Sequence, residues 1–312
     1  MALVENPKSA LVPQLKGVHL FHFDGAPCAQ RVRFALIEKG LARGREVRWN
    51  SKKKRDQRGN NSSWVSRQVS LIKKDHLTDE YAEIHPHMVV PALVHDGRLY
   101  LESMEIVDYV DDTWPDTPLK PRDPALMDQV ASLVDWGKKL HVSVRYVSFH
   151  WGLKDMAKLT EEEEQHLANL EAVDSPEKLT AFYTQYDRDE ISADTYLGHL
   201  QALEAGYAHL EALLSDGRPF LIGDQLTMAD IIWSIKVLRI WECGYPFKRN
   251  FPKLFQWYRR IQKRPGFRDG VMGKHKLLSR LFRMKALFEN LTGQGIRRVV
   301  ARKPAPQLHP AP

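Results

Sequence analysis

Residues 89–103 read VVPALVHDGRLYLES, and this stretch decides the fold. Two apolar runs, 89–94 and 99–101, flank an Asp-Gly pair, which is a strong short-range signal of a β-hairpin. Pro91 lies inside the first run, where it gives up one ladder hydrogen bond. The strand therefore either lies at the edge of a sheet or contains a special cis turn.

The segments before and after the hairpin predict an α/β domain. Residues 18–23 form a short buried strand, a helix runs from Pro27 to Gly40, and residues 45–49 form a second strand. Because parallel neighbours need a crossover, we expect a parallel unit of strand, helix and strand. A helix, the hairpin and a last helix from Ser103 complete the domain.

Changes in composition predict the domain boundaries. We place the first domain at residues 17–114, with a basic, aperiodic insertion at about 50–76. A proline-rich linker, 115–124, leads to an all-helical second domain at residues 125–291. The basic and proline-rich tail, 292–312, is expected to be disordered.

Apolar periodicity of about 3.6 residues recurs throughout the second domain. Thr227 and Asp230 have the spacing of a capping box, so a buried helix is expected to start there. The expected helices span residues 125–156, 160–171, 193–214, 227–242, 252–263 and 274–291.

Composition excludes several classes of protein. With 43% hydrophobic and 27% charged residues, the 312-residue chain is typical of a soluble globular protein. We expect a cytoplasmic location, because the start has no signal-like core and no run approaches the ~18 apolar residues that span a bilayer. Cys28 and Cys243 are too few for a disulfide framework, and the histidine spacing supports no metal site.

Three short motifs, in this order along the chain, resemble the glutathione transferase superfamily: Ala26-Pro27-Cys28, Val90-Pro91 and Glu102-Ser103. The resemblance covers about residues 17–267. It implies a thioredoxin-like first domain, a helical-bundle second domain and glutathione as co-substrate. It also implies that Pro91 is cis, that Val90 pairs with the cysteinyl backbone of glutathione, and that Glu102 and Ser103 take its γ-glutamyl end.

The chemistry must proceed without a hydroxyl in the first turn, because no Tyr or Ser occurs between His19 and Gln30. Cys28 or the amides at the helix start are left to hold the glutathione thiolate. Cys28 is either a reactive thiol of this kind or a small buried residue. The position of Cys28, the long insertion and the segment 241–245 resemble bacterial hydroquinone dehalogenases and their relatives, the β-etherases. The dehalogenases' Ser-X-Cys is absent, because Ala26 stands at the serine position.

That resemblance implies an electrophilic, aromatic co-substrate and displacement of an aryloxy or halide group. We expect the co-substrate to lie against the first long helix of the second domain, with His141, Tyr146 and His150 as candidate contacts. The resemblance further implies a dimer, formed with a second copy or with a related chain.

Two other interpretations remain open. The basic segment 52–74 could make the fold a non-catalytic module for nucleic acid or an acidic partner, but only Trp64 interleaves with its charges. We therefore expect no nucleic-acid partner. Residues 274–302 have apolar residues at helical spacing among basic ones, as membrane-surface helices do. Folding back over the mouth of the active site is the use we favour, so no membrane partner is expected.

Overall fold

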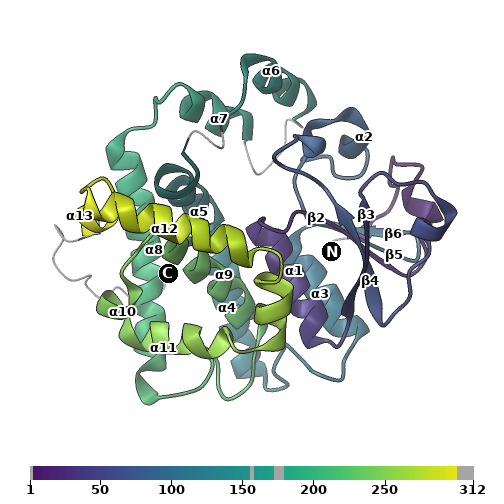
Figure 1. The fold of residues 1–312 in the computed structure, drawn as a ribbon. Coiled ribbons are helices and arrows are strands. Elements are labelled where there is room, and N and C mark those ends of the chain that lie inside the picture. Colours follow the sequence, from purple (N-terminus) through teal and green to yellow (C-terminus); the bar gives the residue numbers. More distant parts are fainter. Residues whose placement is uncertain (1–2, 155–157, 172–178, 301–312) are drawn as a thin grey trace. The chain divides into compact units, whose positions relative to one another are not determined.

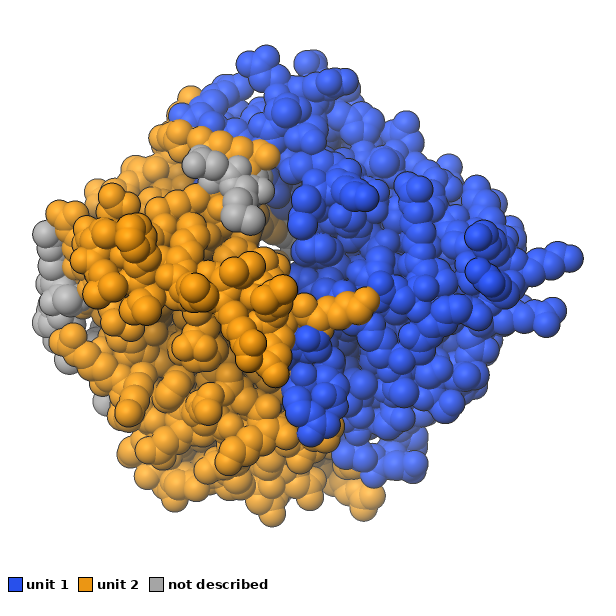
Figure 2. All heavy atoms as spheres, viewed as in Figure 1, with its two compact units in different colours: residues 1–117, 159–188, 268–273 blue, residues 118–158, 189–267, 274–312 orange. Residues whose placement is uncertain are grey.

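The computed structural model describes residues 3–154, 158–171 and 179–300. The chain forms two compact units, coloured separately in Figure 2. Unit 1 comprises residues 1–117, 159–188 and 268–273, and unit 2 comprises the three remaining segments. The units are therefore not the two consecutive blocks of sequence that the linker suggested.

A mixed six-stranded sheet forms the centre of unit 1 (Figure 1). Its strands follow the order β1-β6-β5-β2-β4-β3, with β2, β4 and β3 parallel and the other neighbours antiparallel. All five residues of β2 are buried. The strands are β1 (Leu3–Val4), β2 (Val18–His22), β3 (Ala42–Arg48), β4 (Ser63–Gln68), β5 (Ala92–His95) and β6 (Arg98–Tyr100).

Strand β4 corrects the interpretation of residues 50–76 as an insertion. It lies between β2 and β3, so the strand predicted at 45–49, observed as β3, is the outer neighbour of β4 and does not touch β2. Trp64, Ser66 and Arg67 of β4 are all buried. The sequence signal failed because a buried strand containing an arginine does not show the apolar pattern of a core strand.

The hairpin is confirmed. Asp96 and Gly97 both have positive φ, 50° and 80°, as a two-residue turn between strands of right-handed twist requires. The Asp96 carboxylate also accepts a hydrogen bond from the backbone N–H of Gly17 at 2.7 Å. This bond holds the turn against the residue that precedes β2.

Helices α1 (Pro27–Glu38) and α3 (Ser103–Thr113) pack against each other beside the sheet (Figure 1). Gly40, at φ +81°, allows the chain to turn after α1. The short helix α2 (Asp79–Ala82) and three 3₁₀ segments complete this part: η1 (Val12–Gln14), η2 (Lys54–Gln57) and η3 (Asp75–Leu77). The core also contains Leu11, Val12 and Leu15, which lie before the predicted domain start.

Two helices from the middle of the chain belong to unit 1. Helices α6 (Glu161–Leu170) and α7 (Leu179–Asp187) pack against each other, and Leu167 and Leu179 form a buried cluster with Leu77 and Met88. Thr160 and Glu163 cap α6 reciprocally. Sequence analysis predicted α6 but neither α7 nor the unit to which the pair belongs.

Unit 2 is helical. The predicted helix 125–156 is divided at Leu140 into α4 and α5 and ends in a π-helical turn, η4, while residues 155–157 lie outside the described part. Its elements are α4 (Pro124–Lys139), α5 (His141–Ser148), η4 (Phe149–Leu153), α8 (Ala193–Leu213), α9 (Met228–Glu242), α10 (Phe247–Asn250), α11 (Pro252–Ile261), α12 (Lys276–Leu291) and α13 (Arg297–Val300).

The capping box at the start of α9 is present as predicted. One oxygen of Asp230 accepts from the backbone N–H of Thr227 at 2.9 Å, and the other accepts from the indole of Trp257 at 2.8 Å. Asp230 is fully buried, so these bonds replace the water that its carboxylate gives up.

The expectation of a disordered tail is wrong for residues 292–300. The chain continues from α12 into α13, and Ile296 is fully buried between them. Three apolar residues, Ile296, Val299 and Val300, next to two arginines gave too weak a signal for this packing. Residues 301–312 lie outside the described part of the chain.

Candidate functional site

The Val90–Pro91 peptide bond is cis, as the resemblance implied. Val90 is buried, and only Pro91 separates it from β5. The Tyr81 hydroxyl donates to the carbonyl of Val89 at 2.9 Å, and Val89 also packs against the cluster formed by α6 and α7. The backbone before β5 is therefore held by the hydrogen bond from Tyr81 and by the packing of Val89.

Glu102 and Ser103 lie where the chain enters α3. Glu102 has a left-handed φ of 62° and an exposed side chain, while Ser103 is buried at the first helical position. A non-glycine residue at positive φ is a local strain that often marks a functional position. The N-terminus of α3 also attracts anions, so the exposed carboxylate and the helix start together suit an amino-acid end group.

Arg31 is a candidate site residue that sequence analysis missed. It lies one turn after Cys28 on α1, is buried, and donates from Nη1 to the Ser103 hydroxyl at 3.2 Å. Because Ser103 accepts this bond, its own O–H proton is directed elsewhere and can be donated to a ligand carboxylate. Only the fold brings α1 and α3 together, so no sequence signal pointed to Arg31.

Cys28 lies in the first turn of α1, half-buried, after Pro27 at the first helical position. Ala26 is the N-cap and contributes no side-chain cap. The partial positive charge of the helix N-terminus is therefore directed to this turn without a competing side-chain acceptor at the cap. The structure thus places Cys28, Ser103 and Arg31 on two helix starts that contact each other.

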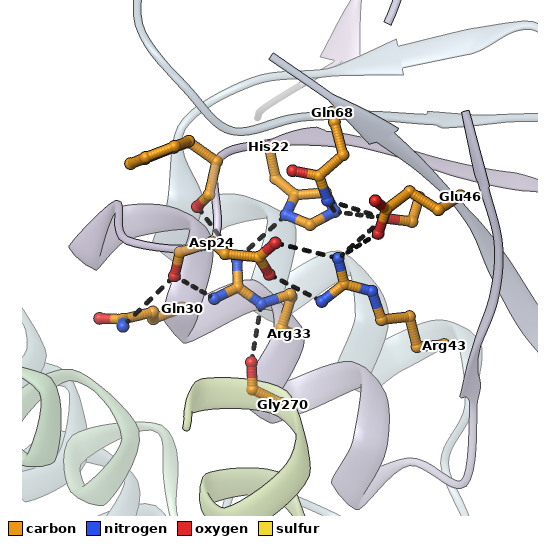
Figure 3. Close-up of polar contacts among 10 residues, drawn as sticks. His22, Asp24, Gln30, Arg33, Arg43, Glu46, Gln68 and Gly270 are labelled. Carbon is orange, nitrogen blue, oxygen red and sulfur yellow. Dashed lines mark hydrogen bonds and ion pairs between the residues drawn. The ribbon is translucent and has the colours of Figure 1, made fainter. Parts of the chain in front are cut away.

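A buried polar cluster holds the turn between β2 and α1 (Figure 3). Arg33 donates to the carbonyls of Phe23 and Asp24, at 3.2 and 2.8 Å, and to Gly270 at 2.7 Å. Arg43 binds the Asp24 carboxylate through two nitrogens, at 2.7 and 3.1 Å. Two arginines therefore fix the backbone and the side chain of the residue that leads into the Cys28 turn.

Charge in this cluster sets the ionisation of Asp24. Burial by itself would raise the pKa of Asp24, but the hydrogen bonds from Arg43 and the positive charge of Arg33 outweigh it and lower the pKa to about 2. Asp24 is therefore a permanent anion above acidic pH. Its role here is to hold the turn, since its carboxylate is already taken by Arg43.

Another buried arginine, Arg67 on β4, holds the segment that follows β3. It donates to the carbonyls of Trp49, Ser51 and Asp56 at 2.7–3.1 Å, and its Nε donates to Nδ1 of His19 at 3.1 Å. Burial and the neighbouring Arg67 lower the pKa of His19 to about 4. Arg67 thus belongs to the core and not to the basic surface with which the sequence grouped it.

In unit 2, Tyr146 and His150 join an aromatic cluster. The Tyr146 ring lies 4.1 Å from His199, and the His150 ring stacks on Tyr196 at 3.9 Å, both measured between ring centroids. Burial lowers the pKa values of His150 and His199, which keeps both rings neutral at pH 7. Sequence analysis missed the two partners on α8, Tyr196 and His199. His141 lies at the start of α5, half-buried.

Within the described ranges, no group of three His, Cys, Asp or Glu side chains is arranged to hold a metal ion.

The fold, the cis proline and the starts of α1 and α3 do not by themselves decide the family. Comparison with known proteins decides it. Residues 20–118 match the family described as glutathione S-transferase, N-terminal domain, and residues 166–260 match glutathione S-transferase, C-terminal domain. The chain belongs to the glutathione S-transferase superfamily. Glutathione is accordingly its co-substrate.

Relatives of this transferase span several kinds of organism. Glutathione S-transferase Z2 of Arabidopsis thaliana is 25% identical over 259 residues, covering 82% of this chain and 91% of that protein. Protein LigF of Sphingobium sp. is 26% identical over 211 residues, covering 64% of this chain and 80% of LigF. The crystal structure of beta-etherase LigF matches with a TM-score of 0.65 at 22% identity, covering 81% of this chain and 98% of that one. These likenesses confirm the predicted fold class.

Proposed function

We propose that this transferase uses glutathione thiolate to attack an aromatic-type electrophile and to displace an aryloxy or halide group. The observation that carries the proposal is the α1 start, where Cys28 lies in the first turn and the sequence offers no Tyr or Ser hydroxyl. The similarity to a protein named beta-etherase favours the aryloxy reaction.

Each group in unit 1 has a distinct task in this proposal. Val90 presents backbone to the cysteinyl part of glutathione, Ser103 and Glu102 hold its γ-glutamyl end, and Arg31 orients the Ser103 hydroxyl. The thiolate draws its stabilisation from the amides and dipole of α1, a contribution of about 0.3–1 kcal/mol that reaches ~2 when partly buried. The sulfur–carbon bond forms as the carbon–oxygen or carbon–halogen bond breaks, and the leaving group departs as an anion.

In unit 2, we assign the aromatic co-substrate to the surface of α5 and η4. Tyr146 and His150 offer ring faces of the kind on which an aromatic ring stacks, and His141 supplies a proton donor. Truncating one of them is expected to raise KM for the aromatic substrate and to leave the KM for glutathione unchanged.

The decisive variant is Cys28→Ser. Ether cleavage that relies on the helix start should remain nearly intact, whereas a reductive dehalogenation that needs a protein thiol to resolve a glutathionyl intermediate should stall. We would measure turnover of a β-aryl ether and of a chlorinated hydroquinone by both forms, with mass spectrometry for a Cys28–glutathione disulfide. If the parent protein turns over neither substrate, the aromatic assignment fails.

A dimer, with a second copy or a related chain, remains part of the proposal. It is expected because transferases of this superfamily typically pair. Sedimentation at micromolar concentration would contradict it by giving the 36.0 kDa mass of one chain.

The alternative of a non-catalytic binding module has less support. Arg67 of its basic segment is buried in the core. Two more of its cations form ion pairs, Lys52 with Glu80 and Lys74 with Glu163. Retention on immobilised glutathione, compared with salt-sensitive binding to DNA, distinguishes the two interpretations.

A further inference from the structure

Helix α12 presents apolar side chains on two sides. On its inner side Phe282 and Ala286 are buried against unit 2. Of the eight large apolar side chains that are strongly exposed in the described residues, six are on this helix, with exposed fractions of 53–78%. They are Leu277, Leu281, Met284, Leu287, Phe288 and Leu291, here called the outer stripe.

The spacing of the outer stripe makes it continuous. Leu277, Leu281, Met284, Phe288 and Leu291 follow one another at intervals of four, three, four and three residues, which places them along one side of a helix. At about 100° per residue, this line lies far around the helix from the buried pair. In Figure 1, α12 runs along the outside of unit 2, in front of α8 and α9.

Positive charge borders the outer stripe. Lys276, Arg280 and Arg283 are exposed along one edge of it, and Lys285 lies at the other edge. The one acidic residue of the helix, Glu289, is buried and paired with Lys154 and Lys285. The exposed side of α12 therefore combines apolar residues with cations and carries no anion.

A basic cleft lies at the C-terminal end of this helix. It has a volume of about 540 Å³ and is lined by Pro246, Lys248, Arg249, Arg297 and Val300. Arg297 donates to the carbonyl of Gly244, a residue that packs closely against Ala286 and Asn290 of α12. Three cations line this cleft and none of its described lining residues is acidic, so the cleft suits a phosphate group.

We propose that the outer stripe and the basic cleft form a docking surface for an anionic lipid bilayer. The stripe enters the boundary between headgroups and acyl chains, the bordering Lys and Arg residues meet lipid phosphates, and the cleft accepts one headgroup. No helix among the described residues has the length and apolarity needed to cross a bilayer, so the contact is peripheral.

Charge distinguishes this partner from a second copy of the chain. The four-three spacing would also suit a helix pair, but two copies would bring Lys276, Arg280 and Arg283 against each other at the border. An anionic surface neutralises the same cations. Folding back over the mouth of the active site, the use favoured from the sequence, stays a prediction.

The test is co-sedimentation of the full chain with vesicles of phosphatidylcholine alone and of equal parts phosphatidylcholine and phosphatidylglycerol. We expect binding to the anionic vesicles, weakened by salt and absent from the neutral ones. Leu281→Ser with Phe288→Ser should lower the partition coefficient at least about tenfold. Lys276→Glu with Arg280→Glu should lower it about fivefold or more per charge.

Ile72→Ser, which removes an equally exposed apolar residue from unit 1, is the matched control and should change nothing. Circular dichroism and melting confirm that each variant is folded. Equal binding to both vesicle types, or to neither, would overturn the proposal. If the protein binds no vesicles and is a dimer that dissociates when the outer stripe is substituted, the stripe is instead the contact with a second copy of the chain.

Discussion

The two sides of the sheet in unit 1 are built on different principles. On the β5 side, the candidate glutathione site uses backbone: the cis turn at Val90 and the start of α3 at Ser103. On the β4 side, a buried side chain holds the structure, that of Arg67 with its carbonyl partners. Substitutions on the β5 side should therefore change ligand binding, and substitutions on the β4 side should change stability.

The largest expected effect comes from Arg67→Met. The variant leaves the buried carbonyls of Trp49, Ser51 and Asp56 without their donor. We expect the free energy of unfolding to fall by about 3–5 kcal/mol, measured by urea denaturation. Glutathione affinity at temperatures where the variant is folded should be retained. Arg48→Met, at an exposed position of β3, should stay within about 0.5 kcal/mol of the parent. An equal loss of unfolding free energy in Arg67→Met and Arg48→Met would show that the buried arginine has no special part in stability.

Acid should weaken the contact between His19 and Arg67 of β4. His19 accepts from Arg67 at Nδ1 and donates from Nε2 to the Lys16 carbonyl, so its folded form is the neutral ring. Its pKa of about 4 lies below the unfolded value of 6.5, and the unfolded chain therefore takes up the proton first as pH falls. Stability should be lost between pH 6.5 and 4, by up to about 3 kcal/mol from this residue.

Denaturation at several pH values in this window, for the parent and for His19→Gln, measures that contribution. His76 and His85, whose burial lowers their pKa values to about 3, contribute in the same direction, so only the difference between parent and variant reports on His19. Parallel curves for the two proteins would show that His19 is not responsible.

The smallest stability effect and the clearest binding effect are expected for Glu102→Ala. Its carboxylate is exposed and does not cap α3, so unfolding should change by less than about 0.5 kcal/mol. Loss of a hydrogen bond to the charged end of glutathione should weaken binding by about 1.5–3 kcal/mol, measured by calorimetry. Glu83→Ala, an equal charge change at another exposed site, serves as control. Unchanged affinity in Glu102→Ala would remove Glu102 from the site.

The same contrast explains what the sequence could predict. The turn at Asp96, the cis proline and the cap at Thr227 are local features, and each has a residue pattern within a few positions of the chain. Strand β4 was missed because Arg67 is buried only through partners up to 48 residues away in the sequence. A charged residue in a basic run looks like surface until those partners are known.

The candidate site residues divide in the same way, into those with a local sequence motif and those that depend on contacts between helices. Val90, Glu102 and Ser103 were predicted from motifs, and their roles remain predictions until glutathione binding is measured. Arg31 depends on the approach of α1 to α3, and Tyr196 and His199 depend on the approach of α8 to α5. Contacts between separate helices have no short pattern, so sequence reasoning about one helix did not find them.

The assembly of unit 1 from three segments has a consequence for synthesis of the chain. Unit 1 takes α6 and α7 from the middle of the chain and residues 268–273 from near its end, where Gly270 accepts from Arg33. The ribosome must therefore release residues 268–273 before unit 1 can close. For the same reason, no single cut in the gene separates the two units, and a chimera spliced at the linker would join α6 and α7 of one parent to the Leu77 and Met88 surface of the other.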